Sequence, residues 1–128
     1  MVAPETSAAE WLRRAHTDLQ VAQVLLRDGK VPAWPVGFHL QQAAEKALKA
    51  ALVHAGRTPP RTHDLQYLVT AAAALAPSLS PWADHLLGLD DFSVAQRYPS
   101  MDEPSLDIDQ AYARVMALLE EVERVCRS

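Results

Sequence analysis

The feature that most constrains this chain is the spacing of its apolar residues, which recur every three or four positions over most of its length. That spacing gathers them on one side of an α-helix, whereas a half-buried β-strand needs strict alternation, which is seen nowhere in the sequence. Four segments carry the helical pattern, at these positions: Leu12, Ala15, Leu19, Ala22 and Leu26; Val36, Leu40, Ala43, Ala47 and Ala51, broadened by Leu48 and Leu52; Leu65, Leu68, Ala72 and Leu75; Ile108, Ala111, Val115, Leu118, Val122 and Val125. The sequence therefore predicts an all-α fold.

Start and stop signals set the expected bounds of the first two helices. Ser7 can cap a helix over about 8–27, and Gly29 can follow its end in the left-handed conformation. The second helix is expected over about 35–55, where Gly56 ends it.

The remaining helices are bounded by capping residues and prolines. Thr62 or Asp64 can cap the third helix, and Asp107 can cap the last. Pro81 suits the first turn of a short additional helix that carries Trp82, Leu86 and Leu89. Segment 91–103 breaks the pattern, and we expect it to be extended or irregular. The prediction is a single domain over residues 1–128, an antiparallel up-and-down bundle of four main helices plus a short extra helix.

Composition agrees with a small cytoplasmic protein that needs no disulfide or metal to fold. The 128 residues are 49% hydrophobic, which is enough for a core, and the formal net charge is −4. That charge argues against tight non-specific binding of nucleic acid. Cys126 is the only cysteine, and neither a signal peptide nor a membrane-spanning stretch is expected.

The second helix carries the densest cluster of polar side chains. His39, Gln42, Lys46 and Lys49 follow one another at spacings of three and four, so they share one face. Gln41 stands four residues before Glu45, and Glu45 stands four residues before Lys49, so each pair can interact. One interpretation is a solvated face with an ordinary ion pair; the other is a binding face.

The loop that follows supplies Arg61, Thr62 and His63, which are suited to bind an anion or a phosphate. The alternative is a helix cap in which His63 hydrogen-bonds locally. Arg97 and Tyr98 are the third candidate site, and here Arg97 can bind phosphate or pair with an acid in the Asp102–Glu103 region.

Several common sites are not expected. The four glycines do not form a phosphate-binding loop, and the sequence implies no cofactor. A metal site is not expected either, because the histidines are spread along the chain at His16, His39, His54, His63 and His85.

These blocks, taken in order, resemble the prokaryotic HEPN family (higher eukaryotes and prokaryotes nucleotide-binding). The resemblance rests on Trp11, Ala15 and Asp18-Leu19, on segment 38–49, on Thr62-His63-Asp64-Leu65 and on Arg97-Tyr98-Pro99. It implies a helical bundle that is commonly a homodimer and is often paired with a minimal nucleotidyltransferase in a toxin–antitoxin system. In several branches, the resemblance implies a metal-independent ribonuclease that depends on an arginine followed after four to six residues by histidine.

The chain departs from this last motif, because no histidine follows Arg97 and Asp102 stands at the corresponding spacing. Ribose cleavage needs a group that exchanges protons near neutral pH, which an imidazole does well. The leading hypothesis is therefore a non-catalytic subunit. It would bind a nucleotidyltransferase, the preferred hypothesis, or a nucleotide. The residues expected to bind are His39, Gln42, Lys46, Arg61, Thr62, His63, Arg97 and Tyr98. The alternatives are a ribonuclease that uses Arg97 with a histidine close in space, and a purely structural oligomerising bundle.

Overall fold

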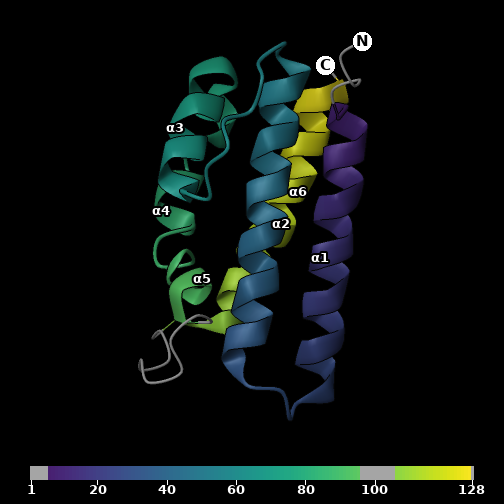
Figure 1. The fold of residues 1–128 in the computed structure, drawn as a ribbon, viewed down its shortest axis with the longest axis vertical. Helices are drawn as coiled ribbons and strands as arrows, with labels where there is room; N and C mark the ends of the chain where they lie inside the picture. Colours follow the sequence, from purple (N-terminus) through teal and green to yellow (C-terminus); the bar gives the residue numbers. More distant parts are fainter. Residues whose placement is uncertain (1–5, 96–105, 128) are drawn as a thin grey trace.

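The computed structural model describes residues 6–95 and 106–127, and within these ranges the chain forms helices and no strand (Figure 1). The helices are α1 (Ala8–Asp28), α2 (Ala33–His54), α3 (Leu65–Leu75), α4 (Trp82–His85), α5 (Asp91–Ala95) and α6 (Ile108–Arg127), with a 3-10 turn at Pro77–Leu79. The predicted all-α bundle is confirmed, and its four long helices are those that the apolar spacing indicated.

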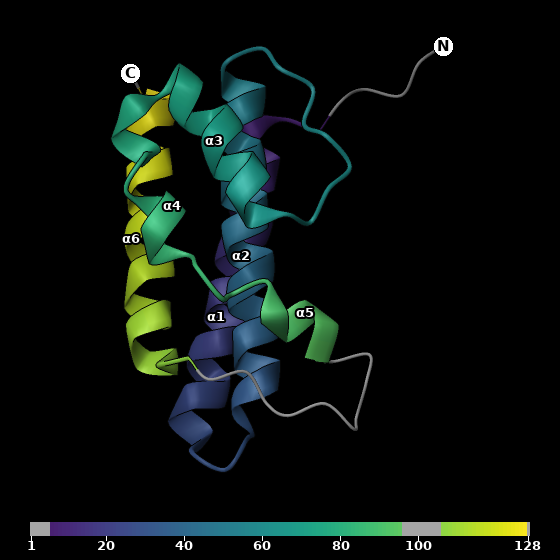
Figure 2. The same ribbon diagram turned by 90° about the vertical axis from the view of Figure 1, so that its left-hand side faces the viewer.

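Helix α2 lies at the centre of the bundle. It forms an antiparallel hairpin with α1, and α6 packs against both helices (Figure 1). The segment α3–α5 covers α2 on the side opposite α1, and the turned view in Figure 2 shows it in front of α2 and α6. Because α2 has neighbours on several sides, 13 of its residues are buried, more than on any other helix.

The predicted caps are formed. The hydroxyl of Ser7 accepts a hydrogen bond from the amide of Glu10 (3.1 Å), and Gly29 ends α1 with φ 74°. Asp64, rather than Thr62, caps α3 by accepting from the amide of Tyr67 (3.2 Å). Asp107 caps α6 through the amide of Gln110 (3.0 Å). Short polar side chains thus satisfy amides that a helix start leaves without partners.

Three expectations about the second half of the chain are wrong. The short helix predicted to carry Trp82, Leu86 and Leu89 ends at His85, and Leu86 and Leu89 lie in the turn that follows it. Residues Asp91–Ala95 form the short helix α5 instead of extended chain, because tertiary packing stabilises a turn that local sequence does not favour. The side chain of Phe92 is fully buried and lies against α2. The apolar spacing predicts that Leu75 lies on the buried side of α3, yet Leu75 is 40% exposed.

Gly37 allows α5 to approach α2. A Cβ atom at position 37 would overlap the Phe92 ring at three of its carbon atoms. Glycine is unfavourable inside a helix, so its presence within α2 is explained by this close contact rather than by helix propensity.

No helix within the described part of the chain is long and apolar enough to cross a membrane.

We expect Gly37→Ala to lower the free energy of unfolding. Overpacking costs about 1–3 kcal/mol, and the severe overlap with Phe92 places this substitution toward the upper end, above the gain of about 1 kcal/mol in helix propensity. In a Phe92→Ala background the overlap is gone, so the same substitution should become stabilising. Urea unfolding of the four proteins in this double-mutant cycle measures both effects, and a destabilisation that is equal in the two backgrounds would contradict the assigned contact.

Candidate functional site

Two buried carboxylates organise the polar side chains of the second helix. Glu45 on α2 is 4% exposed and Asp18 on α1 is 9% exposed. Each holds one lysine and one histidine. We call the first group the Glu45 network (Gln41, Glu45, Lys49 and His63) and the second the Asp18 network (Asp18, His39 and Lys46).

In the Glu45 network, both carboxylate oxygens are engaged. Oε2 lies 3.1 Å from Nζ of Lys49, and Oε1 lies 2.7 Å from Nδ1 of His63. The amide nitrogen of Gln41 donates to Oε1 (3.4 Å) and to the backbone carbonyl of His63 (3.3 Å). A side chain and a main-chain atom of the same loop residue are thus both tied to α2.

This network is buried to a degree that only paired groups tolerate. Gln41 is fully buried and Lys49 is 7% exposed. Burying an unpaired charge costs several kcal/mol, so the carboxylate and the ammonium depend on each other for solvation. Nζ of Lys49 also lies 5.6 Å from the ring centroid of Trp11 on α1, a cation–π distance. The network therefore links α1, α2 and the loop before α3.

The Asp18 network joins the first two helices. One oxygen of Asp18 lies 3.0 Å from Nδ1 of His39, and the other accepts from Nζ of Lys46. Both partners are half-buried, and both stand on the face of α2 that meets α1. The carboxylate thus occupies the seam of the α1–α2 hairpin.

One ring nitrogen of His63 is held by a carboxylate, while most of its side chain is exposed to solvent. Its Nδ1 contacts the buried Glu45 carboxylate, while 70% of its side chain is exposed. A carboxylate that binds one ring nitrogen orients the imidazole and selects its tautomer. His63 therefore has the geometry of a positioned proton donor or acceptor, and it is the most exposed of the described histidines that contact a carboxylate.

Asp90 lies beside the Glu45 network. Its Oδ2 accepts from the backbone amide of Leu65 (3.1 Å), whereas its buried Oδ1 has no hydrogen-bond partner of ordinary length among the described residues. Burial raises the pKa of Asp90, and the nearby carboxylate of Asp64 raises it further. The Leu65 amide and the Gln41 side chain oppose this shift in pKa.

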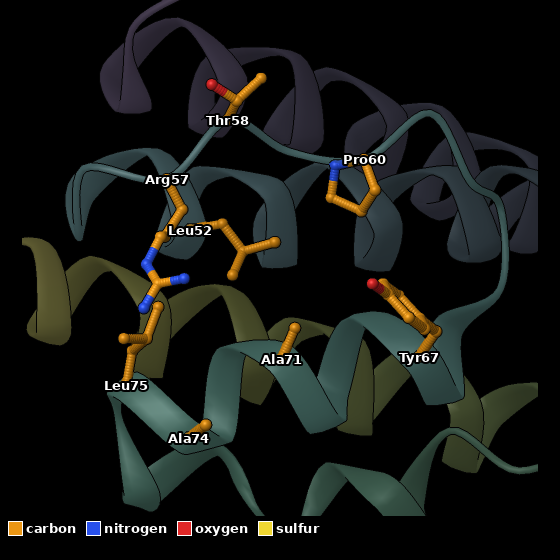
Figure 3. Close-up of a pocket in the computed structure, with 8 residues that line it drawn as sticks. All are labelled: Leu52, Arg57, Thr58, Pro60, Tyr67, Ala71, Ala74 and Leu75. Carbon is orange, nitrogen blue, oxygen red and sulfur yellow. The ribbon is translucent and has the colours of Figure 1, made fainter.

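The loop between α2 and α3 runs back along α2 and leaves an open groove beside α3 (Figure 3). The cavity measures about 500 Å³ and is lined by Leu52, Arg57, Thr58, Pro60, Tyr67, Ala71, Ala74 and Leu75. Figure 3 shows Arg57 and Leu75 at one end and Pro60 and Tyr67 at the other. We call this cavity the Arg57 groove.

A second cavity of about 260 Å³ lies next to it. Its lining is Thr6, Trp11, Lys49, Val53, Thr58, Pro59, Pro60 and Arg61. Both cavities share Thr58 and Pro60, so the loop itself separates them. We call this one the Arg61 cavity.

The candidate residues separate into groups when they are placed in the structure. The Asp18 network brings His39 and Lys46 together, and Gln42 donates to Oε1 of Gln41 (2.8 Å) at the edge of the Glu45 network. His63 joins the Glu45 network, whereas Arg61 lines the Arg61 cavity. Arg97 and Tyr98, together with Asp102, lie outside the described residues.

Two expectations about these residues change. The solvated-face interpretation of α2 is wrong for Gln41, Glu45 and Lys49, which are buried. His63 does not hydrogen-bond locally as a cap would, because its partner Glu45 is 18 residues away. Thr62 makes the local contact instead, accepting from the amide of Asp64 (3.1 Å).

Sequence reasoning missed Asp90, Arg57 and Tyr67, and it included Asp18 only in the family resemblance, without predicting its contacts. The spacing of Glu45 from Gln41 and Lys49 predicted contacts that the structure confirms. No comparable signal marks Asp18 or Asp90, because their partners come from other helices. Within residues 6–95 and 106–127, no three His, Cys, Asp or Glu side chains gather to form a metal site.

Comparison with known proteins agrees with this architecture. The family model of the HEPN domain matches residues 8–126, which is nearly the whole chain. The protein therefore belongs to the HEPN family. A search of curated proteins finds no match.

Replacing Glu45 by alanine should destabilise the fold strongly, by about 3 kcal/mol or more, because Lys49 is left buried without a counter-charge. Glu45→Gln should cost less, since the amide keeps some hydrogen bonds. Urea unfolding measures the loss, and hydrogen exchange should show faster exchange in residues 57–64. Glu10→Ala, which removes an exposed ion pair with Arg13, is the control and should leave the unfolding midpoint almost unchanged. Equal effects of the Glu45 and Glu10 substitutions would contradict the role assigned to the network.

Asp90→Asn should gain stability relative to the native chain as pH rises. A raised pKa means that the folded state favours the protonated acid, so the stability that Asp90 contributes at low pH is lost as pH rises through its folded-state pKa. Asparagine does not ionise, so the difference in unfolding free energy between the variant and the native chain should grow between about pH 3 and pH 7. A difference that stays constant over this range, measured by urea unfolding, would show that burial of Asp90 has no such effect.

Proposed function

We propose that this HEPN protein is a non-catalytic binding subunit, and that its partner is a minimal nucleotidyltransferase of the kind that accompanies similar proteins. The observation that carries the proposal is the attachment of the 55–64 loop to the buried Glu45 carboxylate through His63. The network supports a binding role because it uses its charged groups to hold a surface loop in one conformation.

Preorganisation of this loop favours recognition. A loop that is already ordered loses little conformational entropy when a partner binds. The side chains that it presents, Arg57 and Arg61, make no ion pair with any described residue. Among the described residues they therefore have no carboxylate partner, whereas His39, Lys46 and Lys49 each have one.

The test is co-expression of the chain with the minimal nucleotidyltransferase encoded nearest to it, followed by size-exclusion chromatography with light scattering. We expect the two proteins to elute as one complex that contains two copies of the HEPN chain. Glu45→Gln should weaken the complex, because the loop is held less firmly, while Arg124→Ala on the exposed face of α6 should not. Separate elution of two folded proteins at tens of micromolar, roughly the concentration at which a complex of ordinary affinity persists, would overturn the proposal.

A second candidate function is metal-independent cleavage of RNA, which the geometry of His63 favours. An imidazole held by a carboxylate through one nitrogen and exposed elsewhere can accept or donate a proton. In this alternative His63 supplies the acid–base group that the segment after Arg97 lacks. Cleavage of RNA in the presence of a chelator, lost in His63→Ala and in Arg97→Ala, would favour this candidate over the first. Intact RNA after long incubation with the folded protein would exclude it.

A further inference from the structure

The Arg57 groove combines apolar side chains with an arginine and a tyrosine, a composition that is typical of protein-binding surfaces. Its apolar lining includes Leu52, Ala71 and Ala74. Arg57 stands at one end and Tyr67 at the other (Figure 3). Arginine and tyrosine are enriched among the residues that dominate binding energy at protein interfaces, since each combines a large contact area with a polar group.

The groove is open, which bears on what can occupy it. Tyr67 is 57% exposed and Leu75 is 40% exposed, although both line the cavity. Sites for small molecules bury about 70–90% of their ligand. An open groove with exposed apolar walls fits side chains projecting from a longer protein segment better than it fits a free small molecule.

The Arg61 cavity extends this surface across the loop. It has apolar walls from Trp11 and Val53, and it lies on the other side of Thr58 and Pro60. Lys49 also lines it, but the Lys49 ammonium is bound to Glu45. Each of the two adjoining cavities therefore offers an apolar hollow with one arginine that has no described ion-pair partner.

The charge around the two cavities selects the kind of occupant. None of the described residues that line either cavity is acidic, while Arg57 and Arg61 are cationic and Lys49 is paired with Glu45. This local surface is positive on a chain whose net charge is −4. Such a small positive patch complements a few carboxylates placed between apolar side chains, whereas a nucleic acid strand needs many phosphate contacts.

We propose that the Arg57 groove and the Arg61 cavity together bind an extended acidic segment of a protein partner. One apolar side chain of the segment enters each cavity, and its carboxylates pair with Arg57 and Arg61. The inference deepens the proposed function, because it identifies the surface on which a nucleotidyltransferase or another acidic partner docks.

The first experiment uses the full chain and two blocked synthetic peptides. One peptide alternates glutamate with leucine and phenylalanine, and the matched peptide has lysine in place of each glutamate. In amide NMR spectra, the acidic peptide should shift the signals of Arg57, Tyr67 and Ala71, and the effect should weaken as salt is added. The lysine peptide should leave these signals in place. No shift with the acidic peptide, or equal shifts with both, would overturn the inference.

Variants then assign the binding to these residues. Arg57→Glu/Arg61→Glu should weaken binding of the acidic peptide about tenfold or more, because two attractions become repulsions. The matched control is Arg27→Glu/Lys30→Glu, which changes the net charge equally at the α1–α2 turn, at the opposite end of the bundle (Figure 1). Ala74→Phe, which fills the groove without altering charge, should also weaken binding. Unchanged affinity in both groove variants would overturn the inference.

Two further outcomes separate this inference from the proposed function. If the nucleotidyltransferase binds but Arg57→Glu/Arg61→Glu leaves that complex intact, the proposed function stands and the groove is not its docking site. If the acidic peptide binds the groove and no nucleotidyltransferase complex forms, the groove stands and the proposed partner is wrong. Single-stranded RNA that shifts the groove signals more strongly than the acidic peptide would overturn the choice of a protein occupant.

Discussion

The pairing of the buried Glu45 carboxylate with Lys49 and His63 is the interaction on which the burial of Lys49 and the position of the 55–64 loop depend. Without Glu45, a lysine side chain would lie in the core beside Trp11 with no counter-charge, and the loop before α3 would lose its anchor to α2. Two charges and a helix–loop connection are thus stabilised by one side chain. The desolvation cost of that arrangement is large, and it is offset because nearly every polar atom in the network has a partner.

The Asp18 network also pairs one buried carboxylate with a lysine and a histidine, but it lies between α1 and α2. Asp18 supplies the carboxylate from α1, and α2 supplies the histidine and the lysine. Since α2 contributes to both networks, it is the common element that fixes α1 on one side and the loop on the other. In a small all-α domain of the HEPN family, these polar contacts specify how the helices are aligned along their axes, which apolar packing through alanine and leucine defines less sharply.

Apolar spacing predicted much of this fold, because a helix that buries one side must repeat every three or four residues. It predicted α1, α2, α3 and α6, capping residues predicted several helix ends, and the four-residue spacing of polar side chains predicted the contacts of Glu45 with Gln41 and Lys49. It failed at α5, where burial of Phe92 against Gly37 outweighs weak local preference. It also failed for Asp18, Asp90 and the Arg57 groove, since each is assembled from segments far apart in the chain, and periodicity carries no information about which segments meet.

The central position of α2 also limits how such a protein can change over evolutionary time. With 13 of its 22 residues buried, a substitution on α2 is felt by α1, by α6 or by the loop, so most changes there disturb folding before they alter binding. The loop between α2 and α3 is different, because its ends are anchored while Arg57, Arg61 and the exposed Tyr67 beside it can vary at little cost to stability. New partner preferences would therefore arise chiefly in this loop and along the exposed edge of α3, where substitutions cost less stability than they do on α2.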